Sequence, residues 1–500
     1  MAAGHDRWAN LPAVSGPRPR RRDVLKGALL LGGMATLSPL AALARPQTQN
    51  GGPRSESASA LGLARLLNRT QFNDLPPLAV AHAKMIIAST LACAASGSGA
   101  GSSRIIRDIS KENGGKPEAT VWFDGARLPV SDAAHVNATM SDAFASDDSD
   151  IRNTMHIGTC ITSAGLALAE RTGASGQDLI TAMVVGYEAA GRIFDARRGN
   201  RGGVHASQNV GFGGAATAAR LLKLSDVQMA HAIGLVAVTV GGLAIGTNSW
   251  AREYMGGNAA FAAVNAALAA GRGYTVNDDM LEAQGGYLSV YGGGKPESQL
   301  LTRDYGKEWD IVKYLSIKLR PGSHPYSSMT EAAINAAKEA NVPASQVTKI
   351  FVDRRNLLGA PAPPNDLVEA FHSLEYYLAS AVADKDFNWV HASAAKFRDP
   401  AITRLMSLVE YGPPPQPVKY QWGWGGTVTV VTSSGARFTS TVDAPWGSAP
   451  RGIQWSDVDA KYRTLMPDSK LPAKRIEESL KTIHDFDQVK KVSQLTGMLA

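Results

Sequence analysis

The stretch AVAHAKMIIASTLACAAS, residues 79–96, indicates which kind of fold this chain adopts. Its apolar residues recur at helical spacing, and alanine fills many of the positions between them. A run of this length and periodicity predicts a helix rather than a strand. Because small side chains let helix backbones approach closely, the stretch predicts a helix packed tightly among others.

The same pattern returns along the chain up to about residue 300. Several of these segments end at glycine, as helices commonly do. They are LARLLNRT (63–70), ITSAGLALAERTG (161–173), DLITAMVVGYEAAGRIF (178–194), GAATAARLLKL (214–224) and AAFAAVNAALAAGRG (259–273). We therefore expect close-packed helices without a wide sheet in this part of the chain.

The pattern changes near residue 310, where SIKLRPGSHPYSS (316–328) is typical of a loop. VTKIFVDR (347–354) alternates as a strand does, and residues 427–443 predict a hairpin around Ser434-Gly435. Helical segments are expected between this strand and the hairpin, at 367–384 and 400–409, and again in the C-terminal tail. The sequence predicts a mainly α chain with a large all-helical domain (59–309), a smaller α+β domain (310–446) and C-terminal helices (447–500) that return to the helical domain.

Composition and charge narrow the class of protein. The 500 residues are 44% hydrophobic and 19% charged, as in ordinary globular chains that hold more than one core. The formal net charge is +7, but residues 1–44 hold six Lys/Arg and two Asp/Glu, which leaves +3 for the rest. No basic run is interleaved with aromatic residues, so a nucleic-acid surface is not expected.

The first 44 residues are typical of an export signal. A basic region is followed by a mildly apolar run and by Ala42-Leu43-Ala44, an A-x-A cleavage pattern. Residues 21–26, RRDVLK, are similar to the twin-arginine motif. The eighteen uncharged residues between Lys26 and Arg45 barely suffice for a membrane anchor. We expect a cleaved signal (1–44), a polar linker (45–58), a periplasmic protein and the twin-arginine translocase as a partner during export.

Two other features have simple interpretations. Cys93 and Cys160 are too few for a zinc or iron–sulfur cluster, and we expect two buried thiols. Residues 211–216 match the dinucleotide fingerprint G-x-G-x-x-A, but the segment before them, GGVHASQNV, is no strand. Nucleotide binding is therefore not expected.

The stretch SDDSDIRNTMHIG, residues 146–158, holds three carboxylates within a few residues and then a lone histidine. Aspartate-rich magnesium sites space their carboxylates so that several reach one ion. Here the fourth position after Asp147 is Ile151, so the D-D-x-x-D spacing fails. A solvated or helix-capping acidic loop is favoured over a metal site, and no cofactor is expected.

With its flanks, this stretch resembles the MmgE/PrpD family. Residues 137–158 follow the family pattern N-G…A-H-A-x-D-x-D-D-T…H-P-G, and SAGLALAERTGASG (163–176) follows its ALALAE segment. Further motifs occur in family order within residues 202–228, 241–275, 281–293, 316–328 and 369–384. The resemblance covers about residues 60–500; each motif is weak alone, but six in register are specific.

The resemblance implies a helical domain paired with an α+β lid domain, a homodimer, and activity without metal, nucleotide or cluster. Family members act on small di- or tricarboxylic acids. They remove or deliver a proton beside a carboxylate, followed by loss of water, loss of carbon dioxide or reprotonation. Such a step needs positive charge and hydrogen-bond donors on the substrate oxygens, and a base that titrates near neutral pH, such as histidine.

Five residues take site roles from their positions in the family motifs. His156 matches the histidine of H-P-G and His205 that of G-x-H, so both are predicted to move protons. Ser149 stands where the family has threonine, and Lys318 matches the lysine of K-x-x-P; both are predicted to bind a substrate carboxylate. Tyr376 matches the tyrosine of H-S-x-x-Y and is predicted to be a further catalytic donor.

Four positions depart from the family motifs. Ala145 replaces an aspartate, Arg252 a lysine, Met255 a histidine and Ile157 the proline of H-P-G. Arginine grips a carboxylate in a fork but cannot shuttle a proton, so Arg252 is predicted to bind substrate.

These departures leave several functions open. The first is a cofactor-independent lyase, a dehydratase or decarboxylase, that holds a small polycarboxylic acid between Arg252 and Lys318. The second is an epimerase or isomerase of a dicarboxylate, and the third a relative that binds a carboxylate without turnover. A metal enzyme built on Asp147 and Asp148 is a weaker alternative.

Overall fold

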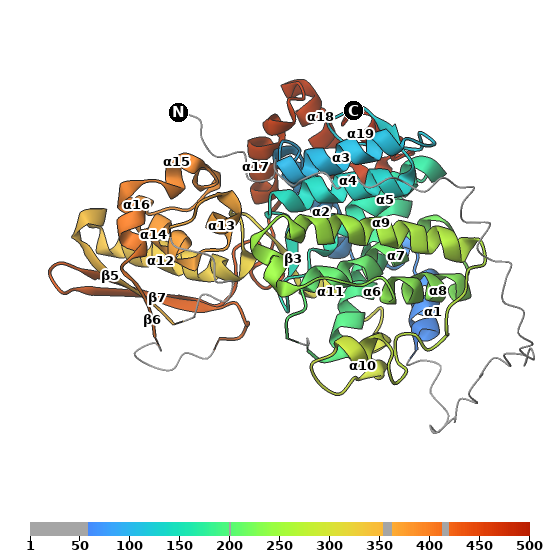
Figure 1. The fold of residues 1–500 in the computed structure, drawn as a ribbon, viewed down its shortest axis with the longest axis horizontal. Helices are drawn as coiled ribbons and strands as arrows, with labels where there is room; N and C mark the ends of the chain where they lie inside the picture. The colour runs from blue at the N-terminus through green and yellow to red at the C-terminus, as the bar shows by residue number, and fades with distance from the viewer. Residues whose placement is uncertain (1–58, 200–201, 354–362, 413–419) are drawn as a thin grey trace, which may run out of the picture. The chain divides into compact units, whose positions relative to one another are not determined.

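The computed structural model describes residues 59–199, 202–353, 363–412 and 420–500 (Figure 1). The signal and linker predicted for residues 1–58 lie outside these ranges. The described chain is mainly helical and has only small sheets, which confirms the predicted fold class.

Most helices share one large hydrophobic core, formed by side chains from residues 60–319 and 453–499. The C-terminal segment therefore shares its core with the helical part of the chain. The helices of this core are α1 (Ala60–Arg69), α2 (Pro77–Gly97), α3 (Gly101–Asn113), α4 (Val130–Ala143), α5 (Ile157–Thr172), α6 (Gly176–Arg197), α7 (Val210–Leu221), α8 (Asp226–Ala237), α9 (Ala251–Gly271), α10 (Tyr287–Tyr291), α11 (Asp310–Lys313), α17 (Trp455–Leu465), α18 (Ala473–His484) and α19 (Ser493–Thr496).

Helix α2 contains the stretch 79–96 and begins with Pro77, whose fixed φ suits a first helical position. It is the one described helix long and apolar enough to span a membrane, but 78% of its most apolar window is buried in the protein. We therefore interpret α2 as a core helix. Cys93, on α2, and Cys160, on α5, are buried free thiols, as predicted.

The close packing expected from glycine and alanine is clearest where α6 meets α7. A Cβ atom on Gly186 would lie 2.6 Å from the Gly213 carbonyl oxygen, and one on Gly213 would lie 2.8 Å from that of Gly186. Glycine at both positions lets the backbones touch. The G-x-G-x-x-A sequence lies inside α7 and thus serves helix packing. A short 3-10 helix, Ala206–Asn209, and not a strand, lies directly before α7.

A second hydrophobic core lies within residues 326–442 and is formed by helices and a four-stranded sheet. The sheet order is β6-β5-β7-β8, and β7 and β8 form the predicted hairpin. The elements are α12 (Ser327–Ala340), β5 (Val347–Val352), α13 (Leu367–Phe371), α14 (Leu374–Asp384), α15 (Ala394–Phe397), α16 (Pro400–Met406), β6 (Val409–Tyr411), β7 (Gly426–Thr432) and β8 (Arg437–Val442).

Four very short strands occur outside the second core. β1 (Ala119–Thr120) pairs with β2 (Arg127–Leu128), and β3 (Asp148–Asp150) pairs with β4 (Leu315–Ile317). The sequence predicted a loop over residues 316–328, but its first residues form part of β4. The β3–β4 pair matters for function because it joins the acidic loop to the segment that leads into the second core.

Candidate active site

A cavity of about 200 Å³ lies beside the loop that precedes α5. Its walls come from that loop, from residues 204–206, from the segment 244–252, from residues 318–325 and from His372. The volume is below that of pockets for drug-sized ligands, so it suits a small molecule. Five of the six predicted site residues line it: Ser149, His156, His205, Arg252 and Lys318.

The β3–β4 pair brings two sides of the cavity together. Ser149 lies opposite Ser316, and the backbone N–H of Lys318 donates to the Asp147 carbonyl at 3.0 Å. Side chains alternate between the two faces of a strand. Ser149 accordingly lines the cavity, whereas its neighbours Asp148 and Asp150 do not.

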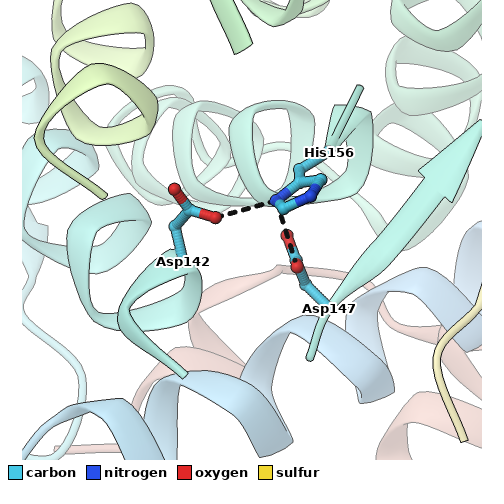
Figure 2. A group of neighbouring side chains, drawn as sticks. All are labelled: Asp142, Asp147 and His156. Carbon is cyan, nitrogen blue, oxygen red and sulfur yellow. Dashed lines mark hydrogen bonds and ion pairs between the residues drawn. The ribbon is translucent and has the colours of Figure 1, made fainter. Parts of the chain in front are cut away.

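His156 lies at the start of α5 between two buried carboxylates (Figure 2). Its Nδ1 lies 2.8 Å from Oδ1 of Asp142 and 3.3 Å from Oδ1 of Asp147. Ionised carboxylates only accept hydrogen bonds, so Nδ1 carries a proton and donates it. The ring is thereby held in one orientation, and Nε2 is the nitrogen left for proton exchange.

Asp142 also accepts a hydrogen bond from Nη1 of Arg252 at 3.0 Å. Burial by itself raises the pKa of Asp142, but the charge of Arg252 and the hydrogen bond from His156 outweigh it and hold that pKa well below its ordinary value. Asp142 therefore stays ionised and connects His156 to Arg252. Sequence reasoning did not select this residue.

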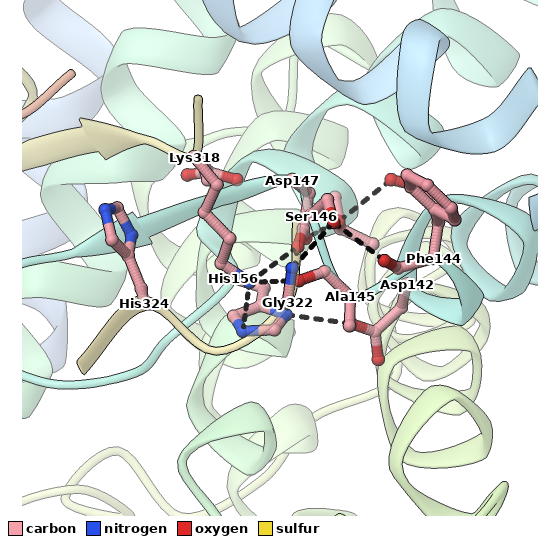
Figure 3. Close-up of polar contacts among 12 residues, drawn as sticks. Asp142, Phe144, Ala145, Ser146, Asp147, His156, Lys318, Gly322 and His324 are labelled. Atoms are coloured by element: carbon pink, nitrogen blue, oxygen red, sulfur yellow. Dashed lines mark hydrogen bonds and ion pairs between the residues drawn. The ribbon is translucent and has the colours of Figure 1, made fainter. Parts of the chain in front are cut away.

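Lys318 is 3% exposed, and its Nζ has three acceptors within reach (Figure 3). These are the Ala145 carbonyl at 2.9 Å, Oδ1 of Asp147 at 3.2 Å and Nε2 of His156 at 3.3 Å. An ammonium has three protons, so in this arrangement each of them has an acceptor. A substrate that exchanges a proton with Nε2 must replace Lys318 there, while the lysine charge stays beside it.

His205 and His372 line the cavity as neutral rings with opposite proton positions. Nδ1 of His205 accepts from the Ser207 backbone N–H at 3.1 Å, so Nε2 carries the proton. Nδ1 of His372 lies 2.7 Å from the Val368 carbonyl and must donate, so Nε2 is a bare acceptor. Burial lowers the pKa of His205 to about 4 and that of His372 to about 3.

Three further polar atoms at the cavity wall have no hydrogen-bond partner among the described residues. They are the Ser149 hydroxyl, Nε of Arg252 and Nδ1 of His324, all in buried side chains that line the cavity. Buried polar groups are nearly always hydrogen-bonded, because leaving one unpaired costs about 1–3 kcal/mol. The Ser149 hydroxyl and Nε–H of Arg252 are thus donors available to a ligand in the cavity.

Residues 62–299 match the MmgE/PrpD N-terminal domain, and residues 324–485 match the MmgE/PrpD C-terminal domain. The chain belongs to the MmgE/PrpD family. Among its curated relatives is the human cis-aconitate decarboxylase, 24% identical over 452 residues that cover 87% of this chain and 93% of the human one. The mouse cis-aconitate decarboxylase is 23% identical over 452 residues, with 87% and 92% covered.

The structure shows what stands at the departures from the MmgE/PrpD motifs. Ala145 lines the cavity, and no carboxylate occupies its position. Instead, Asp142 from the last turn of α4, three residues earlier, supplies a carboxylate to His156. Arg252 is buried and lines the cavity, whereas Met255 is not among the lining residues.

Tyr376 is not brought to the cavity. Its ring is fully buried in the second core, and its hydroxyl donates to the His391 carbonyl at 2.8 Å. The next residue, Tyr377, reaches the cavity wall instead: its hydroxyl accepts from the Ser323 backbone N–H at 2.5 Å and donates to the Pro321 carbonyl at 2.8 Å. His372, from the same motif, is the member that lines the cavity.

The expectation of a solvated acidic loop is wrong, because Asp147, Asp148 and Asp150 are all buried. The helix-capping alternative holds for Asp148, whose Oδ2 accepts from the Gly158 backbone N–H at 3.0 Å in the first turn of α5. Asp147 accepts from Thr159 and Lys318 and lies beside His156. The loop thus belongs to the site rather than to the surface.

One group of side chains in the described chain has the spacing of metal ligands, namely Asp142, Asp147 and His156 (Figure 2). Their ligand atoms lie within 4.8 Å of one another. The two carboxylates already face cations, because Arg252 pairs with Asp142 and Lys318 pairs with Asp147. A divalent ion here would be repelled by two fixed positive charges within the same cluster.

Proposed function

We propose that this protein is a lyase of the dehydratase/decarboxylase class that acts on a small di- or tricarboxylic acid by proton transfer next to a carboxylate. Family membership and the cis-aconitate decarboxylase relatives support the class of enzyme. The observation that carries the proposal is the His156 arrangement: a histidine fixed at Nδ1 by a carboxylate, with Nε2 directed to a small cavity beside two cations.

In this proposal Nε2 of His156 takes the proton from the substrate carbon. The carbanion that forms is stabilised when negative charge on the adjacent carboxylate meets donors and cations. The unpaired Nε of Arg252, the Ser149 hydroxyl and Nε2–H of His205 are the donors at the wall. Asp142 keeps the imidazolium in place after it has gained the proton.

The bare Nε2 of His372 favours dehydration over decarboxylation within this class. A lone pair that faces a polyanion is repelled by its carboxylates, whereas it accepts a hydrogen bond from a hydroxyl group. A hydroxylated polycarboxylic acid satisfies both His372 and the donors on the other walls. Loss of that hydroxyl, with the proton held on His156, gives water and a carbon–carbon double bond.

The proposal is tested by incubating the purified protein with citrate, 2-methylcitrate, cis-aconitate, tartrate and amino-dicarboxylates, and following each by NMR. Formation of an unsaturated acid and water from a hydroxy acid is the expected result. Carbon dioxide release would assign a decarboxylase, and inversion without loss of a group an epimerase. Thermal stabilisation by one of these acids without any change in the acid would show a carboxylate-binding relative and contradict the proposal.

We also propose that the protein is exported to the periplasm by the twin-arginine route and acts as a homodimer. The RRDVLK sequence at residues 21–26 supports the first point and the family resemblance the second. Replacing Arg21 and Arg22 by lysine should retain the protein in the cytoplasm, as cell fractionation would show. Sedimentation of the purified protein should give twice the chain mass, and a monomer would contradict the second point.

A further inference from the structure

A buried lysine from the C-terminal part of the chain contacts the loop that carries Asp147. Lys461 lies on α17 and is 2% exposed. Its Nζ donates to the Ser146 carbonyl at 2.5 Å and to the Ser89 hydroxyl at 2.8 Å. It forms no ion pair with a carboxylate among the described residues, and burial lowers the pKa of its ammonium. Burying an ammonium is costly unless it is paired and hydrogen-bonded, so these two hydrogen bonds carry the compensation for Lys461.

The backbone that Lys461 contacts has an unusual conformation. Ala145 has a φ of 52°, in the left-handed region that residues with a Cβ adopt only when the surroundings impose it. Two lysines hold the two successive carbonyls of this turn: Lys318 contacts that of Ala145 at 2.9 Å and Lys461 that of Ser146.

A third contact comes from the segment that leads into the second core. The Ser146 hydroxyl donates to the Phe144 carbonyl at 2.9 Å and accepts from the Gly322 backbone N–H at 3.0 Å (Figure 3). The turn at 145–146 is thus held by Lys318 just after β4, by Lys461 on α17 and by the loop at Gly322. Elements far apart in the sequence fix one pair of peptide groups.

This turn determines where two carboxylates lie. Asp142 precedes it on α4 and Asp147 follows it, and Oδ1 of each lies within 3.3 Å of Nδ1 of His156. A rotation of the Ala145–Ser146 peptides would move Asp147 relative to His156 and Lys318. The contact from α17 therefore bears on the geometry of the proton-transferring group, although Lys461 itself is not a lining residue of the cavity.

We propose that Lys461 is a positioning residue: it holds the left-handed turn at Ala145 and Ser146 so that Asp147 and Lys318 keep Nε2 of His156 aligned with the substrate. The proposal assigns helix α17, in the C-terminal part of the chain, a part in catalysis beyond its packing in the core. This proposal rests on the proposed function in those experiments that measure turnover, and is independent of it in those that do not.

The test compares Lys461→Met, which removes charge and donor, with Lys461→Gln, which keeps an N–H donor for the Ser146 carbonyl. Lys84→Met is the matched control. Lys84 links α2 to the C-terminal part of the chain through the His484 carbonyl at 2.9 Å and through an ion pair with Asp487, and it has no contact with the turn. All three variants are made in the full chain and measured for thermal midpoint, kcat and KM.

Lys461→Met is expected to lower kcat about 10–100-fold with little change in KM, because small misplacements of a reacting group cost about this much. Lys461→Gln is expected to recover part of the loss, and Lys84→Met to lower the thermal midpoint without changing kcat. Equal losses of midpoint and an unchanged kcat in all three variants would overturn the proposal. If Lys461→Met fails to fold, Lys461→Ala takes its place, and a wild-type kcat in that variant would overturn the proposal.

A readout without substrate separates this proposal from the proposed function. Hydrogen–deuterium exchange of peptides that cover residues 142–150 should be faster in Lys461→Met and unchanged in Lys84→Met. Unchanged exchange in both variants would overturn the positioning role. Inactivity of the wild-type protein toward every acid tested would count against the proposed function alone.

Discussion

Strand β3 has a buried charged cluster on each of its two sides, and the two clusters differ in how completely their polar atoms are paired. On one side Arg152 lies among Asp150, Asp195 and Asp310, with its guanidinium 3.8 Å from the centre of the Tyr314 ring. On the other side Asp142, Asp147 and His156 lie at the cavity.

In the Arg152 cluster every member is hydrogen-bonded. Nη1 of Arg152 donates to Asp195 at 2.7 Å and Nη2 to Asp310 at 2.8 Å, and both oxygens of Asp150 accept from Arg152. In the cavity cluster Oδ2 of Asp142 has no hydrogen-bond partner among the described residues. The same holds for two neighbouring atoms at the cavity wall, Nε of Arg252 and the Ser149 hydroxyl oxygen. The paired cluster suits a structural role, whereas the unpaired one suits a ligand.

The largest difference between the clusters should appear when His156 is changed to glutamine. We expect turnover to fall about 10³-fold, near the middle of the range for a lost acid/base group, while the thermal midpoint stays within a few degrees. Circular dichroism and steady-state kinetics on the same samples test this. Activity near the wild-type level would remove His156 from the mechanism.

Arg152→Met should have the opposite effect. It leaves Asp150 and Asp310 buried without their cation, which costs about 3–5 kcal/mol of stability when a buried ion pair is broken. Denaturant unfolding at neutral pH measures the loss. The remaining folded protein should keep its kcat at low temperature. A large fall in kcat of Arg152→Met under conditions in which the variant is fully folded would show that the two clusters are not separate in function.

Arg252→Gln tests whether the Arg252 guanidinium, which pairs with Asp142, also binds substrate. A lost hydrogen bond to a charged group costs about 1.5–3 kcal/mol, so we expect KM to rise roughly 10–100-fold. Arg252→Lys, which restores the family residue, should recover part of this loss. Equal KM values for wild type and Arg252→Gln would place the substrate carboxylate elsewhere.

Two buried carboxyl groups, that of Asp148 on β3 and that of Glu188 on α6, stay protonated at neutral pH. Burial and the charge of Asp147 raise the pKa of Asp148 to about 8, and burial and Asp310 do the same for Glu188. Such a group has a higher pKa in the folded than in the unfolded chain, so its protonation favours the folded state. Its contribution to the free energy of unfolding is fully present below pH about 4 and is lost as pH rises through about 8.

From pH 5 to pH 8 each of these two carboxyl groups therefore contributes a decrease in stability, whereas His205 and His372, whose pKa values are lowered, contribute an increase up to about pH 6.5. Asp148→Asn and Glu188→Gln, which cannot ionise, should each reduce that decrease by an amount on the order of 2 kcal/mol. Thermal unfolding of the three proteins across this range measures the slopes. A steeper decrease in either variant would contradict the protonated state of that residue.

Removal of divalent ions should have the smallest effect. The cations Arg252 and Lys318 already face Asp142 and Asp147, so EDTA is expected to leave turnover unchanged within error. The control is activity after added magnesium or zinc. Loss of activity with EDTA and recovery with a metal would turn the cavity cluster into a metal centre.

Periodicity was enough to predict most of the helices and the hairpin at 427–443, and motif order selected six site residues, five of which the fold places at one cavity. Periodicity and motif order do not predict which way a side chain points, and they selected the wrong residue where that direction determines access to the cavity. Tyr376 and Tyr377 are adjacent, and spacing alone does not show which hydroxyl reaches the cavity wall. Asp142 stands at the histidine of the A-H-A part of the family pattern, where no site residue was selected, and Lys461 falls outside the motifs. Only the fold shows that both lie at the loop around Ala145.

The central claim is that His156 exchanges a proton with a carbon beside a substrate carboxylate. Proton NMR of a turned-over acid in deuterated water tests it directly, with wild type and His156→Ala compared at equal folding. We predict that wild type incorporates deuterium at that carbon and that His156→Ala does not. Incorporation at the wild-type rate in His156→Ala would contradict the claim.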